Sequence, residues 1–287
     1  MIEFRKLTPE DRERYDRLLF ESGERGCEFT FANLYLWGRQ RIAFIHDHAV
    51  LFSQFDRRTV YPFPVGGGDK RAALEAVMAD AHQRDIPCRF TGLTERDIRL
   101  LEELYPGRFF FHCDRDSYDY VYAIDDLAEL KGKKYQKKRN HVNRFRAAHP
   151  DCRVQPLSAE NLEGVKALVD GWYESRLAQD PTADFLMERR ALEKALRDYE
   201  KLGMESLVLL EGERVLAFTM GASWQKTPWM STLKRPGRMW TAPMLPSTAP
   251  LPAISGKNIP RCSFSTGRRT WVCPACARPR KATCPIT

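Results

Sequence analysis

Residues 59–91 read TVYPFPVGGGDKRAALEAVMADAHQRDIPCRFT, and this stretch decides the fold class. Asp69 is a favourable N-cap for the helix that follows it. Ala73, Val77 and Ala81 recur every four residues, which predicts one buried helical face. Short segments rich in β-formers stand on both sides of this helix. The pattern therefore predicts strands that alternate with helices, an α/β (α+β) fold.

The same alternation continues in both directions. We expect strands at 2–7, 42–55, 59–63, 88–91, 108–112, 118–124 and 152–155, where 42–55 holds two strands that meet at 46–48. We expect helices from residue 9 and at 29–37, 70–84, 95–104, 133–148, 159–176 and 188–202. A hairpin is expected at 206–220. The order predicts one domain at 1–150 and the start of a second at 151–221.

Composition narrows the class of protein further. The chain has 287 residues, 43 % of them hydrophobic and 29 % charged, which is enough apolar material for one or two cores. No apolar run approaches the roughly 20 residues of a membrane span, and the N-terminus lacks the apolar region of a secretory signal. We therefore expect a cytoplasmic protein with no stable membrane insertion.

Residues 222–287 have a different composition from the rest. They contain no Asp or Glu and carry +11, which leaves −3 for the first 221 residues, and they hold ten of the 18 prolines. Cys273 and Cys276 form a C-x2-C pair flanked by Cys262 and Cys284, but a zinc knuckle site ordinarily uses two such pairs. We expect no metal site in the chain and no native structure in this tail.

Residues 131–146, KGKKYQKKRNHVNRFR, carry the clearest chemical signal. They contain eight Lys or Arg and no acid. On a helix, Tyr135, Val142 and Phe145 would share one side and pack inward, which leaves many cations outside to bind an anion. The alternative is an ordinary solvated face. Gly66–Gly68 precede a helix and could hold a phosphate, but they lack the spacing of a phosphate-binding loop, and a turn capped by Asp69 is the favoured interpretation.

Several separated segments resemble one bacterial family. They are CEFTFANLYLW (27–37), YPFPVGGGDKRAAL (61–74), SYDYVY (117–122) and DDLAELKGKKYQKKRNHVNRF (125–145). Together they resemble the soluble family named for the C-terminal domain of phosphatidylglycerol lysyltransferase, over residues 1 to about 221.

That resemblance implies tandem GNAT-like acyl-CoA N-acyltransferase domains, the second incomplete here. It implies transfer of an acyl or aminoacyl group, with acyl-CoA or aminoacyl-tRNA as the candidate donor and tRNA or another anionic donor as a partner. We expect the anionic group to be held by Lys134, Lys138, Arg139, Asn140 and Asn143. No catalytic residue and no oligomeric state follow from the sequence. The alternative function is a non-catalytic RNA- or anion-binding protein with a degenerate double GNAT fold.

The family pattern breaks at Gly221, and the genetic code explains the break. If the third base of each codon starts a new codon, Trp229-Met230 can give only Asp, and Trp271-Val272 can give only Gly. With permitted codons, residues 264–287 become LNREEDMGLPGLRKAKESYLPDH, which resembles a late motif of the family. We infer a frameshift at codons 220–223, either a mutation or a sequencing error, that impairs the encoded activity.

Overall fold

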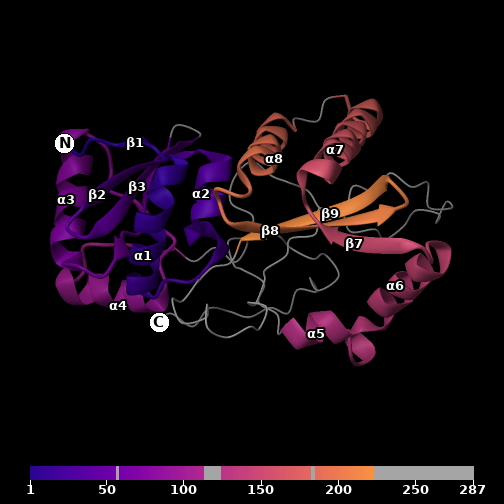
Figure 1. Ribbon diagram of the computed structural model, residues 1–287. Helices are drawn as coiled ribbons and strands as arrows, with labels where there is room; N and C mark the ends of the chain where they lie inside the picture. The colour runs from indigo at the N-terminus through magenta and orange to yellow at the C-terminus, as the bar shows by residue number, and fades with distance from the viewer. Residues whose placement is uncertain (56–57, 113–123, 182–184, 223–287) are drawn as a thin grey trace.

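The computed structural model describes residues 1–55, 58–112, 124–181 and 185–222. The expected strand at 118–124 falls almost entirely outside these ranges, and so does the tail beyond residue 222. The described residues form a mixed α+β fold with two sheets, the first indigo to purple and the second rose to orange in Figure 1.

The first sheet uses short strands from the first 91 residues. They are β1 (Arg5–Lys6), β2 (Gln40–Ile45), β3 (His48–Phe55), β4 (Arg58–Pro62), β5 (Val65–Gly66) and β6 (Phe90–Thr91). The order is β1-β2-β3-β4-β6, with β5 also paired to β3. All of these pairs are antiparallel except β4–β6, which is parallel because a helix connects the two strands.

Helices cover both faces of the first sheet. They are α1 (Arg12–Ser22), α2 (Phe31–Trp37), α3 (Lys70–Gln83) and α4 (Glu95–Leu104), with 3-10 turns η1 (Pro9–Asp11) and η2 (Cys27–Phe29). Leu51 belongs to the core cluster built with α1 and α2, whereas Val50 packs with Val77 and Ala81 of α3. Adjacent residues of β3 therefore enter two cores, as strand alternation requires.

The second sheet has three antiparallel strands, β7 (Cys152–Pro156), β8 (Met204–Glu211) and β9 (Arg214–Ala222), in the order β7-β8-β9. Helices α7 (Ala159–Gln179) and α8 (Leu186–Asp198) lie on one face of it (Figure 1). Val208 and Phe218 pack into the core on that face. On the opposite face Val154 is 61 % exposed, and Leu209 beside it is half-buried.

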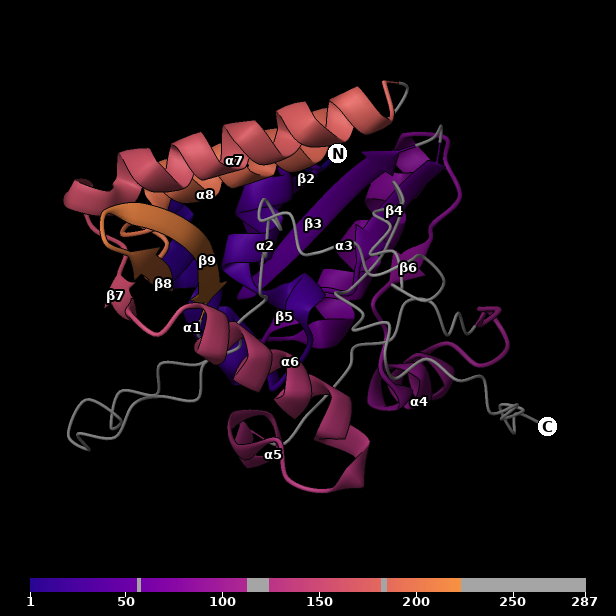
Figure 2. The ribbon, with the colours of Figure 1, turned by 90° about the vertical axis from the view of Figure 1, so that its right-hand side faces the viewer.

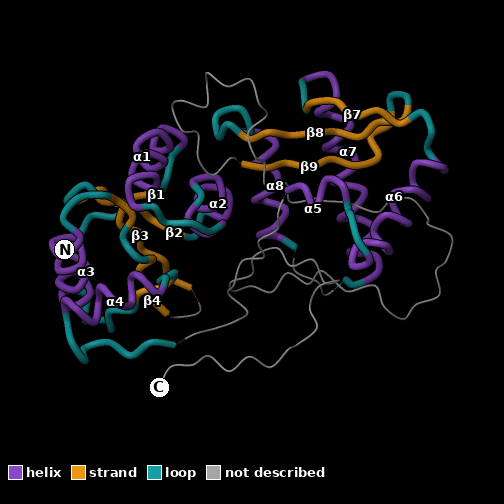
Figure 3. The backbone as a smooth tube through the Cα atoms, turned by 90° about the horizontal axis from the view of Figure 1, so that it is seen from below, coloured by secondary structure: helices purple, strands orange, loops and turns teal. Residues whose placement is uncertain are grey.

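Between the sheets, the chain forms α5 (Ile124–Glu129), a 3-10 turn η4 (Lys133–Tyr135) and α6 (Gln136–Ala148). Figures 1 and 3 place α6 next to β7, on the side of the second sheet away from the first. Figure 2, turned by 90°, shows α5 and α6 below the second sheet, on the opposite side from α7 and α8.

The two sheets are joined through α2 and α8. The Tyr35 hydroxyl donates to the Asp198 carboxylate over 2.7 Å, and Lys194 Nζ donates to the Tyr35 carbonyl over 3.0 Å. Leu202, which follows α8, belongs to the core cluster of the first sheet. The second half is thus anchored by a buried polar contact and by an apolar side chain.

Most expected elements are confirmed, with shifts of a few residues at their ends. Glu95–Leu104 forms a helix with the predicted bounds, and Asp69 caps α3 through the Ala72 amide. The strand expected at 108–112 is wrong, because these residues are irregular: Phe109 and Phe111 pack against a core cluster without joining a sheet. Helix α5 and strand β5 were not expected.

Candidate functional site

The basic segment forms the predicted helix, with its first residues in a 3-10 turn. Gly132 starts that turn at φ 86°, in the region that glycine adopts without a steric penalty. Tyr135 is buried and anchors the turn, but no residue of α6 itself is buried. Helix α6 is therefore an exposed basic helix that is anchored at its N-terminal end by Tyr135.

The guanidinium of Arg139 donates hydrogen bonds within the protein. Its Nη1 donates to the carbonyl of Leu130 and, over 2.7 Å, to that of Gly132. Leu130 and Gly132 both have positive φ and reverse the chain between α5 and α6. Arg139 thus holds this turn, and the sequence missed that role because the acceptors are backbone atoms.

Lys134 also has an internal partner. Its Nζ lies 2.8 Å from the Asp126 carboxylate, and this hydrogen bond raises the pKa of the Lys134 ammonium. Lys131 pairs likewise with Glu129. The basic run contains no acid of its own, yet α5 supplies the acids that neutralise its first turn.

The remaining predicted residues follow along α6. Lys138 is half-buried, whereas Asn140 and Asn143 are exposed. Four further cations of the basic segment are exposed and make no ion pair with any residue that the structure describes: Lys133, Lys137, Arg144 and Arg146. The cations that remain available for an anion therefore lie on both sides of Arg139 along the basic segment.

The apolar side of α6 differs from expectation. Tyr135 packs inward as predicted, but Val142 and Phe145 are each 37 % exposed. The Phe145 ring stacks on His149, with 4.7 Å between ring centroids. The prediction that all three side chains pack inward is wrong for Val142 and Phe145, since the described residues of the second sheet do not cover them.

The glycine-rich loop before α3 has a packing role. A Cβ on Gly66 would lie 2.1 Å from the Asp47 carbonyl oxygen, and one on Gly68 would lie 2.4 Å from that of His46. Glycine is therefore needed so that this loop can approach the β2–β3 turn. The turn interpretation explains these glycines without a bound phosphate.

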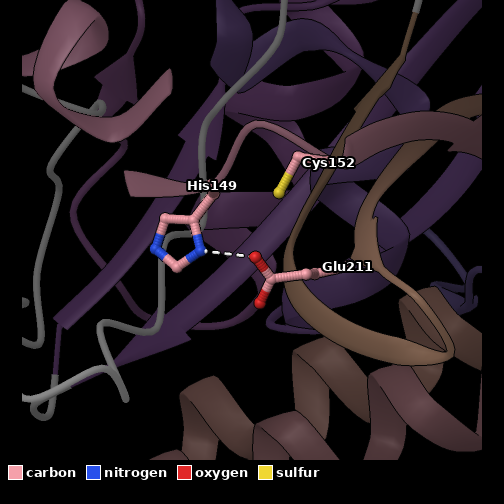
Figure 4. Close-up of side chains that lie close together, drawn as sticks. All are labelled: His149, Cys152 and Glu211. Carbon is pink, nitrogen blue, oxygen red and sulfur yellow. Dashed lines mark hydrogen bonds and ion pairs between the residues drawn. The ribbon is translucent and has the colours of Figure 1, made fainter. Parts of the chain in front are cut away.

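A second group of side chains converges where α6 ends, and sequence reasoning missed it. His149 Nδ1 lies 2.9 Å from Glu211 Oε1, and the Cys152 thiol is close to both (Figure 4). Burial, helped by Glu211 and Asp151, raises the pKa of the Cys152 thiol, which disfavours a nucleophilic thiolate. The H-x-x-C spacing was the available signal, but Glu211 joins it only through the pairing of β7 with β8.

Comparison with known families identifies the chain. The model described as "Phosphatidylglycerol lysyltransferase, C-terminal" matches residues 20–238, most of the sequence. The chain belongs to this family. The match contains α6 and both sheets except the N-terminal β1, and it extends past Gly221.

Two solved structures resemble this chain, and the first of them supports the same fold. A conserved protein of unknown function from Bacteroides thetaiotaomicron is 34 % identical with a TM-score of 0.71, covering 77 % of this chain and 75 % of that one. The C-terminal domain of a candidate lysylphosphatidylglycerol synthetase from Agrobacterium fabrum is 15 % identical with a TM-score of 0.46, covering 74 % of this chain and 64 % of that one. No curated protein matches.

The described helices also bear on membrane association. Among the residues that the structure describes, no helix is both long enough and apolar enough to cross a bilayer.

Proposed function

We propose that the protein is a GNAT-like acyl or aminoacyl transferase whose donor is an anionic carrier, acyl-CoA or aminoacyl-tRNA. Membership of the phosphatidylglycerol lysyltransferase C-terminal family supports this proposal. The observation that carries it is the exposed basic helix α6, because both carriers bring phosphates that such a helix can bind.

The proposed chemistry is direct attack of an acceptor amine or hydroxyl on the donor ester or thioester carbonyl. A C–N or C–O bond forms, the C–O or C–S bond to the carrier breaks, and the acceptor proton ends on the departing oxygen or sulfur. Backbone N–H groups and nearby cations would stabilise the oxyanion that forms. Lys138, Asn140 and Asn143 would contact the anionic carrier together with Lys137 and Arg144 of the same helix. Lys134 and Arg139 would act indirectly, by holding the turn that positions α6.

The test is to titrate the full chain with tRNA and, separately, with acyl-CoA across a series of salt concentrations. We expect the triple variant Lys137→Ala, Arg144→Ala, Arg146→Ala to lower the salt slope for tRNA by about two to three, since each phosphate-bound cation contributes about 0.7–0.9. The thermal midpoint should stay unchanged, because these side chains have no ion-pair partner in the described structure.

The matched control is Arg139→Ala, which removes one cation from the same helix. We expect it to lower the thermal midpoint, because the carbonyls of Leu130 and Gly132 lose their donor. An unchanged slope in the triple variant would mean that α6 is a solvated face. Binding of tRNA without transfer by a frame-restored chain would favour the non-catalytic RNA-binding alternative.

We further propose that the shifted frame after codons 220–223 impairs this activity. The proposal rests on the codon pattern of the residues after 223 and on the 49 residues after 238 that the family match leaves out, although the match itself continues 15 residues beyond codon 223. Sequencing the gene around codon 221 tests the proposal directly. A continuous frame with no family-like sequence in the alternative frame would contradict it.

A further inference from the structure

We propose that His149, Cys152 and Glu211 form a binding site for one divalent transition-metal ion of the zinc class. One nitrogen, one sulfur and one carboxylate oxygen of these residues all lie within 4.8 Å of one another. Figure 4 shows the Cys152 sulfur and the Glu211 carboxylate both directed towards the Nδ1 side of the imidazole. The inference is independent of the proposed transferase activity.

Three different elements bring these ligands together. His149 is the C-cap of α6, Cys152 begins β7, and Glu211 ends β8. Cys152 and Glu211 are direct cross-strand partners, and such partners project on the same face of a sheet. The Cys152 amide donates to the His149 carbonyl over 3.4 Å, which fixes the tight turn between them.

The spacing suits a tetrahedral ion. Zinc–ligand distances of about 2.0–2.3 Å place neighbouring ligand atoms about 3.3–3.8 Å apart in a tetrahedral site. The observed pair of His149 Nδ1 and Glu211 Oε1 is slightly closer, at 2.9 Å. All three ligand atoms lie within 4.8 Å of one another, so side-chain rotations that bring them to the tetrahedral spacing would admit the ion. The three protein ligands leave one position for water or an external ligand.

The donor set selects the metal. A thiolate and an imidazole favour zinc or a similar borderline ion, whereas magnesium and calcium prefer oxygen ligands alone. The thiolate and the carboxylate together carry two negative charges, which neutralise a divalent cation. The side chains of His149 and Glu211 are 26 % and 35 % exposed, so solvent can deliver the ion.

Two features of α6 favour a cation at this place. The C-terminal end of a helix carries partial negative charge, and His149 caps that end. The Phe145 ring stacks on the imidazole at an interplanar angle of 30° and restricts its rotation, as outer-shell groups do in metal sites. A bound ion would tie the end of the basic helix to the edge of the second sheet.

This site departs from the sequence-based expectation of no metal site in the chain, an expectation argued above from the cysteines of the tail. The experiment must therefore separate Cys152 from those cysteines. The full chain, kept reduced, is titrated with Co²⁺ and then with competing Zn²⁺. We expect one equivalent of Co²⁺ to give a thiolate-to-cobalt charge-transfer band and tetrahedral d–d absorption, both of which zinc displaces.

The variants assign the ligands. Cys152→Ser should abolish the charge-transfer band and lower zinc affinity by more than about 100-fold, the upper end of the loss found for outer-shell groups. The matched control replaces Cys262, Cys273, Cys276 and Cys284 with serine and should keep the band. A band that survives in Cys152→Ser and disappears in the control would overturn the proposal.

Glu211→Gln provides a second reading, because it retains the size of the side chain. It should weaken zinc binding while circular dichroism stays unchanged, even if Cys152→Ser fails to fold. Equal zinc affinity in Glu211→Gln and the native chain, or no cobalt spectrum with cobalt in excess, would mean that His149 and Glu211 form an ordinary ion pair.

Discussion

The two sheets of this protein bury their apolar faces to different degrees. In the first, β3 lies between neighbouring strands, and helices cover both faces, so Val50 and Leu51 are both buried. In the second, α7 and α8 cover one face, while Val154 on the other is largely exposed. Within the described residues, β9 pairs only with β8. The first sheet is thus covered on both faces. The second is covered on one face, so we expect its stability to depend on its junction with the first.

This difference bears on function, because the basic helix and the proposed metal site belong to the more open half. Helix α6 lies beside β7, and Cys152 and Glu211 belong to β7 and β8. An exposed location leaves these groups accessible to a large anionic carrier and to a metal ion. The closed first sheet would then act mainly as the support on which the second half is held.

The largest expected effect compares one leucine in each sheet. Leu51→Ala should lower the free energy of unfolding by about 2–5 kcal/mol, because it leaves a cavity in a sealed core. Leu209→Ala should cost about 1 kcal/mol or less, since its side of β8 is half-open. Urea unfolding of both variants measures the difference. Equal losses would show that the second sheet is covered on both faces.

A second contrast concerns two buried glutamates. Glu24 in the first half contacts Arg96, whereas Glu188 on α8 is buried beside Tyr173 and Arg176 of α7. Burial raises the pKa of Glu188 to about 7, from an ordinary value of 4.5, although Arg176 and Tyr173 oppose the shift. The folded state therefore binds this proton more tightly than the unfolded state does.

Its contribution to stability is full below pH 4.5 and is lost as the pH rises through about 7. The loss amounts to about 3 kcal/mol at most. Glu188→Gln should remove this pH dependence, and the two curves of unfolding free energy between pH 5 and 8 give the difference. Parallel curves for the native and variant chains would place the Glu188 carboxylate in a solvated environment.

Local signals were sufficient for much of the fold. Asp69 caps α3 as predicted, and the spacing of Ala73, Val77 and Ala81 located that helix. The aromatic run at 108–112 misled the prediction, because β-propensity does not supply a neighbouring strand. Strand order and the parallel β4–β6 pair depend on long-range packing and were not predicted.

The site was predictable only in outline. The basic run located α6, but the sequence did not show that Arg139 would hold the carbonyls of its own turn. It also did not show that Asp126 would pair with Lys134, because that contact joins two helices across a reversal of the chain. The convergence of Cys152 and Glu211 required the register of β7 with β8, which no local pattern encodes.

A smaller effect is expected at the junction between the halves. Tyr35→Phe removes the hydroxyl that donates to Asp198, and hydrogen bonds to charged groups contribute about 1.5–3 kcal/mol. We expect a loss near the lower end, because Asp198 keeps its ion pair with Arg197 at 2.7 Å. The matched control is Tyr15→Phe, whose buried hydroxyl has no hydrogen-bond partner in the described structure. A comparable loss in Tyr15→Phe would indicate a packing effect.

The smallest expected effect is a difference in amide exchange between the central strands of the two sheets. β3 is flanked by paired strands and lies beneath helices on both faces, whereas β8 has helices on one face and β7 and β9 as its neighbours. Local opening of β8 should therefore require less free energy than opening of β3. We expect β8 amides to be protected at least about tenfold less, which corresponds to about 1.4 kcal/mol. Tyr35→Phe should widen this gap, because it loosens the anchor that couples the halves. Equal protection of β3 and β8 in the native chain would instead show that both sheets open together as one cooperative unit, with α8 transmitting the stability of the first sheet to the second.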